Sequence, residues 1–349
     1  MVLIVQGIVF IPLYLHQLGD DLYGYWLATG GILAWFSMVD VGAAGVTQQR
    51  CAAAYGREDL QGVVDYLWHG LVVMLGVGLV FTGLILFFSN RITGWLGIPE
   101  ADKTLVTGCF LFAAAGTYCY LFSLVFRAFC AALQRNEVHS AANFLGSVGA
   151  ILVIYIALIH WDWGLWALPA GQFFRTSSQF LIVGLYSTYL LKRIDHAPVW
   201  RKATFRDYRQ NTTALLASKA SGNLVNSLPK ILLTRMVGPE ATVLYTVNMR
   251  PIEMAGAFIN RANSSLFAAF SHYCGDNSVS TNQYHRLGKK VAWVFGGVAT
   301  TTVLCYCVLN KPFIHIWLGP DQFAGQLFTS LAAVASFLLF KNNLFGGLA

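Results

Sequence analysis

Charged residues are scarce in this 349-residue chain. Asp, Glu, Lys and Arg together make up 11% of it, less than half of the roughly 25% that is typical of soluble domains. Hydrophobic residues reach 56%, and the mean hydropathy is +0.57. So few polar groups cannot cover the surface of a domain in water. The composition therefore excludes an ordinary soluble protein and indicates an integral membrane protein.

The sequence also lacks the patterns of catalytic and metal sites. It contains no Walker loop, no G-x-S-x-G motif and no H-x-x-x-H or H-E-x-x-H spacing among its eight histidines. Its seven cysteines form no C-x-x-C pair and lie mostly within apolar runs, so neither a disulfide framework nor a zinc site is expected. We therefore predict a protein that is not an enzyme and that has no metal and no cofactor.

What the chain has instead is a series of apolar runs that are poor in charge. They cover residues 1–17, 25–49, 62–88, 104–126, 138–161, 163–191, 211–233, 241–270, 291–310 and 323–340. A helix needs about 20 apolar residues to cross a hydrocarbon core of about 30 Å, and lipid requires every backbone group to be paired. We predict an all-α, polytopic membrane protein with about ten transmembrane helices.

Basic residues are distributed unevenly over the segments between these runs. The segments that follow even-numbered runs hold 14 Lys and Arg residues, whereas those that follow odd-numbered runs hold four. Short cytoplasmic loops are enriched in basic residues, so we expect a multi-pass protein with a cytoplasmic N-terminus. The net charge of +7 then reflects topology, and we expect no nucleic-acid partner.

A repeated pattern indicates duplication. Gly19 and Gly56 are separated by 37 residues, as are Gly238 and Gly275. The sequence Trp-Leu-Gly also occurs twice, at residues 95–97 and 317–319. Matches in the same order favour two lobes of equal orientation, as in parallel repeats of transporters.

The repeat predicts how the chain is divided. We expect an N-terminal six-helix lobe at residues 1–191, a basic cytoplasmic linker at 192–210 and a C-terminal lobe with four helices at 211–349. Relative to a twelve-helix pattern, the first helix is slightly shortened and the last two helices are missing. The expectation is therefore a truncated or ten-helix form of that architecture.

Several of these segments resemble a known family. The stretches Ile11-Pro-Leu-Tyr-Leu15, Tyr23-Gly-Tyr-Trp26, Val39-Asp-Val-Gly42 and Ile316-Trp-Leu-Gly-Pro320 resemble those of the O-antigen flippases, the Wzx-type polysaccharide exporters. The resemblance implies a two-lobed, MATE-like helical bundle of the multidrug, oligosaccharidyl-lipid and polysaccharide (MOP) exporter superfamily. It implies that undecaprenyl-pyrophosphate-linked oligosaccharide crosses the bacterial inner membrane by alternating access. It also implies the lipid-linked oligosaccharide, the lipid bilayer and polysaccharide polymerase or assembly proteins as partners.

Five basic residues lie inside the apolar runs, namely Arg175, Lys219, Lys230, Arg250 and Arg261. A cation at bilayer depth is costly unless it faces a cavity or a partner, and a pyrophosphate headgroup supplies the opposite charge. We therefore predict a cationic, substrate-binding lumen, with Arg175 and Arg250 nearest the midplane. Snorkelling of these long side chains to an interface is the alternative for each of them.

Two asparagines extend this predicted lining. Asn223 and Asn226 share a helical stripe with Lys219 and Lys230, because the spacings of 4, 3 and 4 residues place all four on one face.

Two deep carboxylates, Asp40 and Glu253, are candidates for coupling to H⁺ or Na⁺. Glu253 follows Arg250 by three residues, so an intrahelical ion pair is its alternative role. The alternative role of Asp40 is structural, namely to hold helices together.

Two other function classes remain open. A MATE-like multidrug or cation antiporter would share the fold, but buried cations outnumber buried acids five to two, which favours an anionic substrate. A membrane-embedded glycosyltransferase would use Asp20 and Asp21 to activate an acceptor. Against it, the loops are too short for a soluble catalytic domain, and Asp21 recurs as Glu240 in the repeat.

Overall fold

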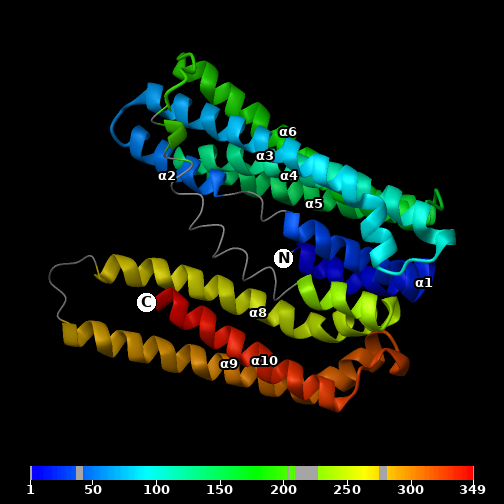
Figure 1. Ribbon diagram of the computed structural model, residues 1–349. Helices are drawn as coiled ribbons and strands as arrows, with labels where there is room; N and C mark the ends of the chain where they lie inside the picture. Colours follow the sequence, from blue (N-terminus) through cyan, green and yellow to red (C-terminus); the bar gives the residue numbers. More distant parts are fainter. Residues whose placement is uncertain are drawn as a thin grey trace. The chain divides into compact units, whose positions relative to one another are not determined.

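The computed structural model describes residues 2–36, 42–202, 204–206, 208, 227–274 and 281–348. This part of the chain is helical and has no strand (Figure 1), which confirms the predicted all-α class. The helices are α1 (Val2–Phe36), α2 (Ala43–Tyr55), α3 (Leu60–Trp95), α4 (Glu100–Ala132), α5 (Asn136–Ile159), α6 (Ala167–Ile194), α8 (Pro239–Cys274), α9 (Thr281–Trp317) and α10 (Gln326–Leu348), with short 3₁₀ turns η2 (Gly164–Trp166) and η3 (Pro320–Gln322). Residues 227–236 are also helical.

Four described helices are long and apolar enough to cross a membrane. They are α3, α4, α5 and residues 289–317 of α9. Large apolar side chains on the outer face of α3, such as Leu79, Val80 and Leu86, are exposed. Lipid is the solvent in which such a surface is stable.

The first two predicted runs differ from the observed helices. α1 continues past the first run to Phe36, with a break at Gly19, where φ is 74° and ψ is 168°. The second run is shared between α1 and α2, and α2 begins after Gly42, which has φ 72°. Hydrophobicity marks lipid-compatible segments but not the points at which they bend, and here glycine supplies positive-φ conformations that other residues avoid.

The described chain forms two compact units, unit 1 (Met1–Thr242) and unit 2 (Val243–Ala349). The boundary lies beyond the predicted linker at 192–210, because residues 227–239 pack against α1. A Cβ atom added to Gly31 would lie 3.3 Å from the side chain of Ile231, and one added to Gly24 would collide with the backbone of Pro239. The division into lobes of six and four helices remains a prediction.

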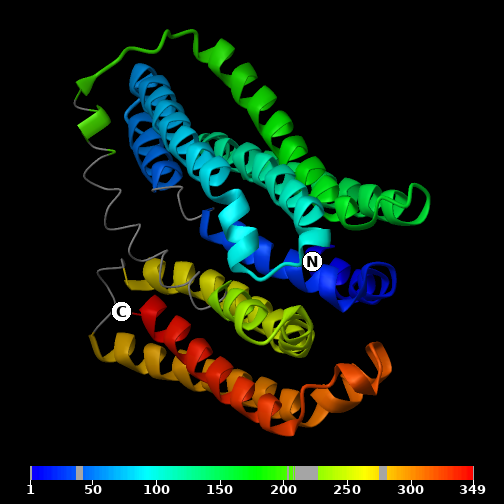
Figure 2. The same cartoon turned by 45° about the vertical axis from the view of Figure 1, so that its right-hand side comes forward.

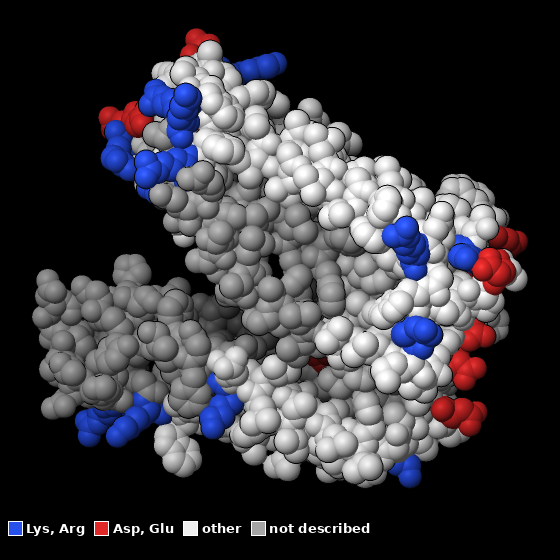
Figure 3. Space-filling view, viewed as in Figure 1, with Lys and Arg blue, Asp and Glu red and all other residues white. Residues whose placement is uncertain are grey.

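Helices α2, α3, α4 and α6 share the main core of unit 1. Its largest buried side chains include Leu67, Met74, Leu121 and Phe129. α3 packs along α4, while α4 and α5 both pack along α6 (Figures 1 and 2). On the face of unit 1 seen in Figure 3, Lys and Arg side chains gather at the end where α6 finishes.

Unit 2 consists of α8 from Val243 onward, α9, η3 and α10. Its core includes Ile252, Tyr306 and Phe340. The buried side chain of Asn248 donates through Nδ2 to the carbonyl oxygens of Leu244 and Gln322, at 2.8 Å each. The hydroxyl of Tyr306 donates to the Asn248 carbonyl at 2.8 Å. Asn248 thus joins α8 to α9 through its backbone carbonyl and to the η3 turn through its side-chain amide.

Candidate functional site

Arg175 and Gln172 lie one helical turn apart on α6 and line two cavities within unit 1. One cavity has a volume of about 210 Å³ and the other of about 270 Å³. Helix α6 is held close to α5 at this point, because a Cβ atom on Gly146 would lie 2.9 Å from the carbonyl oxygen of Arg175. The backbone that carries the guanidinium is therefore fixed by packing.

The smaller cavity has an aromatic wall that comes from α1. Tyr14, Tyr23 and Trp26 line it, and the rings of Tyr14 and Tyr23 have centroids 5.5 Å apart with an interplanar angle of 43°. These two tyrosines lie on opposite sides of the break at Gly19. The break therefore lets one helix supply both rings to the same cavity.

The larger cavity lies among α1, α4 and α6 and is lined by Thr117, Tyr120 and Thr176 in addition to Gln172 and Arg175. The hydroxyl of Thr117 donates to the carbonyl of Ala113 at 3.0 Å, and that of Thr176 donates to the carbonyl of Gln172 at 3.0 Å. Since those hydroxyl protons are already used, the donors that remain for a ligand there come from Gln172, Arg175 and the hydroxyl of Tyr120.

Arg175 has no carboxylate partner in the part of the chain that the structure describes. The ion pairs of Lys103–Glu100, Arg135–Glu137, Arg201–Asp65 and Arg250–Glu253 do not include it. Its Nε atom is buried and has no hydrogen-bond partner among the described residues. An uncompensated cation at this depth is unfavourable, so the cavity is electrostatically suited to an anion.

The predicted pair of Arg250 and Glu253 forms an ion pair on α8. Nη1 of Arg250 lies 3.7 Å from Oε2 of Glu253, and the two side chains are 31% and 38% exposed. The intrahelical alternative raised for these residues is thus present in the structure. Lys230 is half-buried in the helical residues 227–236.

The other predicted site residues fall where the structure gives no side-chain description. Asp40, Lys219, Asn223 and Asn226 lie outside the described residues, and only the backbone of Arg261, in α8, is described. Their predicted roles stay predictions. In the described part of the chain, no group of three His, Cys, Asp or Glu side chains could hold a metal ion.

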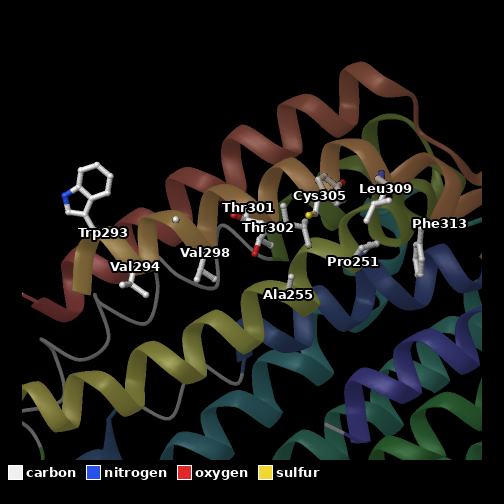
Figure 4. A pocket seen from close by; sticks show the side chains of 14 residues that line it. Pro251, Ala255, Trp293, Val294, Val298, Thr301, Thr302, Cys305, Leu309 and Phe313 are labelled. Carbon is white, nitrogen blue, oxygen red and sulfur yellow. The ribbon is translucent and has the colours of Figure 1, made fainter. Parts of the chain in front are cut away.

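A groove of about 700 Å³ in unit 2 contrasts with the cavities beside Arg175. Figure 4 shows that α8 supplies Pro251 and Ala255 to it, while α9 supplies a row of side chains from Trp293 to Phe313. None of its 14 lining residues is charged. This groove does not provide the charge that an anionic headgroup requires.

Sequence reasoning missed Tyr14, Tyr23, Trp26 and Gln172 as lining residues. The aromatic side chains did not stand out, because aromatic residues make up 14% of the chain. Gln172 could have been found, since it precedes the predicted Arg175 by three residues and so shares its helix face.

Comparisons with solved structures identify the fold. The inward-facing conformation of a multidrug resistance MATE family transporter of the MOP superfamily aligns with a TM-score of 0.74 at 12% identity, over 99% of this chain and 86% of that one. A MATE transporter in complex with MaD3S aligns with a TM-score of 0.67 at 15% identity, over 99% and 80%. A mutant of the Vibrio cholerae MATE transporter VcmN aligns with a TM-score of 0.66 at 13% identity, over 99% and 81%. The predicted MATE-like bundle is confirmed.

Sequence comparisons identify the family. No curated protein sequence matches this chain significantly. The family described as "Polysaccharide biosynthesis protein" matches residues 4–274, which is more than half of the chain and includes every residue that lines the two cavities of unit 1. The chain therefore belongs to the polysaccharide biosynthesis protein family, and it has the fold of the MATE transporters of the MOP superfamily.

Proposed function

We propose that this protein moves an undecaprenyl-pyrophosphate-linked oligosaccharide across the inner membrane by alternating access. The observation that carries the proposal is Arg175, a guanidinium without a carboxylate partner among the described residues, which lines two cavities together with Gln172. Membership of a polysaccharide biosynthesis family supports a substrate from glycan assembly.

The chemistry of the cavities suits the two parts of such a substrate. A guanidinium presents a planar fork of donors that matches phosphate oxygens, and its attraction to an anion is stronger in a medium of low dielectric constant. Tyr14, Tyr23 and Trp26 offer ring faces on which the apolar faces of a sugar can pack. The site thus combines a phosphate-binding cation with a wall suited to carbohydrate.

Further cations would let the headgroup pass from one position to the next. Lys219, Lys230, Arg250 and Arg261 are proposed for this, with Asn223 and Asn226 as polar lining. The 3.7 Å separation of Arg250 and Glu253 is that of a weak, partly exposed pair, in which a phosphate could replace the carboxylate. Asp40 and Glu253 are the candidates for coupling to H⁺ or Na⁺.

Export of organic cations is the competing function, and the fold of the MATE transporters favours it. The cavities of unit 1 oppose it, because the charged side chain that lines them is Arg175 and no carboxylate does so. A lipophilic cation would be repelled there, whereas a pyrophosphate would be attracted.

Leaflet exchange in proteoliposomes tests the proposal. Wild-type protein should move a fluorescent polyprenyl-pyrophosphate glycan between leaflets, and Arg175→Ala should slow that exchange at least about tenfold, since a hydrogen bond to a charged group is worth about 1.5–3 kcal/mol. Arg91→Ala is the matched control, because Arg91 is exposed on α3 and stacks over Phe87 at 4.9 Å. It should leave the rate unchanged.

Two results would contradict the proposal. One is transport of an organic cation without exchange of the glycolipid, which would establish the antiporter. The other is transfer of a sugar from a lipid donor to an acceptor, which would establish a glycosyltransferase.

A further inference from the structure

The segment after α6 is attached to the first turns of α3. This linker segment, meaning the described residues of 195–208, reaches Asp65, whose side chain is only 2% exposed. Oδ1 of Asp65 accepts hydrogen bonds from Nε2 of Gln61 and from the backbone N of Val199, each at 2.8 Å. Nε of Arg201 lies 3.0 Å from Oδ2 as an ion pair. The buried carboxylate of Asp65 thus fixes the linker segment at Val199 and at Arg201.

His69 fixes the same segment one helical turn further along α3. Its Nδ1 lies 2.6 Å from the carbonyl oxygen of Asp65, and its Nε2 accepts from the backbone N of Arg201 at 3.2 Å. The imidazole stacks on the indole of Trp200, with ring centroids 4.5 Å apart and an interplanar angle of 23°. Trp200 is therefore held in one orientation.

Tyr208 anchors the far end of the linker segment. Its hydroxyl donates to the carbonyl of Tyr66 at 2.7 Å and lies 2.8 Å from Oγ1 of Thr47. Burial raises the pKa of the Tyr208 hydroxyl well above its ordinary value, so the proton needed for these contacts stays in place. A segment held at both ends is a fixed part of unit 1 and not a loose tether.

The outward face of the linker segment combines exposed apolar and basic side chains. Val199, Trp200 and Phe205 are exposed although they are large and hydrophobic. Lys202 and Arg206 are exposed beside them, and neither has an ion-pair partner among the described residues. Water is a poor environment for the apolar side chains. An anionic membrane surface is a favourable one for the basic side chains.

The position of Asp65 on α3 sets the depth of this face. Residues 66–90 of α3, between Asp65 and Arg91, contain no Asp, Glu, Lys or Arg, and they span about 37 Å at about 1.5 Å per residue. A hydrocarbon core is about 30 Å thick. Asp65 therefore lies near the headgroups at one end of α3, and Trp200, stacked on His69, lies at the depth that tryptophan prefers.

We propose that the linker segment is a binding surface for the headgroups of acidic phospholipids. Lys202 and Arg206 attract the phosphodiester groups, Trp200 and Phe205 enter the interface, and Asp65 and His69 hold the segment in register with the membrane surface. The surface acts independently of the cavities beside Arg175, so it does not depend on which substrate is transported.

Hydrogen exchange in nanodiscs tests this surface. Peptides from the linker segment should exchange more slowly as phosphatidylglycerol replaces phosphatidylcholine, and about 0.5 M salt should reverse the effect because it screens exposed charges. Each basic residue near an anionic membrane contributes roughly fivefold in affinity. The double variant Lys202→Gln/Arg206→Gln should thus bind roughly 25-fold more weakly and lose the protection.

Two further variants separate this surface from general effects of charge and folding. Lys289→Gln/Lys290→Gln removes the same charge from exposed positions on α9 and should keep the protection. Asp65→Asn should speed exchange of the linker segment in both lipids and weaken its response to phosphatidylglycerol. Three results would overturn the proposal. The first is hydrogen exchange of the linker segment that does not change with phosphatidylglycerol, and the second is an equal loss of protection in both double variants. The third is full protection by inorganic phosphate in phosphatidylcholine nanodiscs.

Discussion

At the scale of single residues, Arg175 is the charged side chain that lines the two cavities of unit 1. Close packing of α6 against α5 fixes the backbone that carries the Arg175 guanidinium. No carboxylate among the described residues neutralises this charge. An arginine at bilayer depth costs about 2.5–3.5 kcal/mol on insertion scales. We therefore expect a variant with a well-packed apolar residue at this position to be more stable than the native protein.

Arg175→Leu should separate stability from function. We expect the free energy of unfolding in detergent to rise by about 1–3 kcal/mol, because an uncompensated cation is removed, while glycolipid exchange is lost. Arg175→Lys should keep the stability of the wild type and recover only part of the exchange, since lysine lacks the bidentate fork. Lower stability of Arg175→Leu in denaturant titrations would mean that the guanidinium has a partner in the folded protein.

A second residue-scale prediction concerns Asn248 in unit 2. Asn248→Ala would leave the carbonyl of Gln322 without its 2.8 Å donor and should lower the free energy of unfolding by about 1–3 kcal/mol, the cost of an unsatisfied buried group. Thr300→Ala is the control, because the hydroxyl of Thr300 is exposed and its one bond among the described residues is to the carbonyl of Gly296 in its own helix, at 2.7 Å. Equal stability of the two variants would show that the Asn248 contacts contribute little.

Some of these residues could be predicted from the sequence and others could not, for a physical reason. Arg175 could be predicted because a cation is conspicuous in an apolar run. Tyr14 and Trp26 could not, because aromatic residues are common in lipid-facing and core positions alike. Asp65 was overlooked because it falls at the start of a run, where a charged residue is ordinary, and its contacts to the linker segment depend on the fold.

At the scale of elements, α1 shows how one glycine shapes a cavity. Gly19 has φ 74° and ψ 168°, a region that is accessible essentially to glycine alone. It lies between Tyr14 and Tyr23, whose rings lie side by side in the smaller cavity. The conformation of one residue thus controls the aromatic wall.

Gly19→Ala should therefore disturb the cavity without any steric clash. No heavy atom lies within 4 Å of the Cβ position, so the expected loss of about 1–3 kcal/mol in unfolding free energy comes from the backbone alone. Gly76→Ala in α3 also has open space but no positive φ, and it should be neutral or stabilising. If both variants had the same stability and the same exchange rate, the break at Gly19 would not matter.

Most helices could be located from the sequence, because a lipid-crossing helix requires a long apolar run. The runs at 62–88, 104–126 and 138–161 lie within or close to α3, α4 and α5. The positions of the breaks could not be predicted in the same way. They depend on backbone conformation at Gly19 and Gly42, which hydrophobicity does not encode.

At the scale of the whole molecule, family and fold agree with the resemblance seen in the sequence. The predicted lobes at 1–191 and 211–349 and the cytoplasmic N-terminus remain predictions. The packing of residues 227–239 against α1 could not be inferred from the repeat, because a repeat gives equivalent positions but not contacts between its copies.

Cysteine labelling tests the predicted orientation. In a cysteine-free background, a membrane-impermeant reagent added from the periplasm should label single cysteines placed next to Gly97 or Gly319, and it should not label one placed at Lys202. The reason is the excess of basic residues in the segments after even-numbered runs. Labelling at Lys202 and protection near Gly97 would reverse the topology.

The lack of a carboxylate partner for Arg175 among the described residues also has a consequence for handling the protein. If the cavity binds pyrophosphate as proposed, it should attract any small oxyanion, so phosphate or sulfate in a purification buffer should compete with the glycolipid. Affinities measured in phosphate-buffered saline should be weaker than those measured in a chloride buffer of equal ionic strength. The choice of buffer thus becomes part of any binding experiment on this protein.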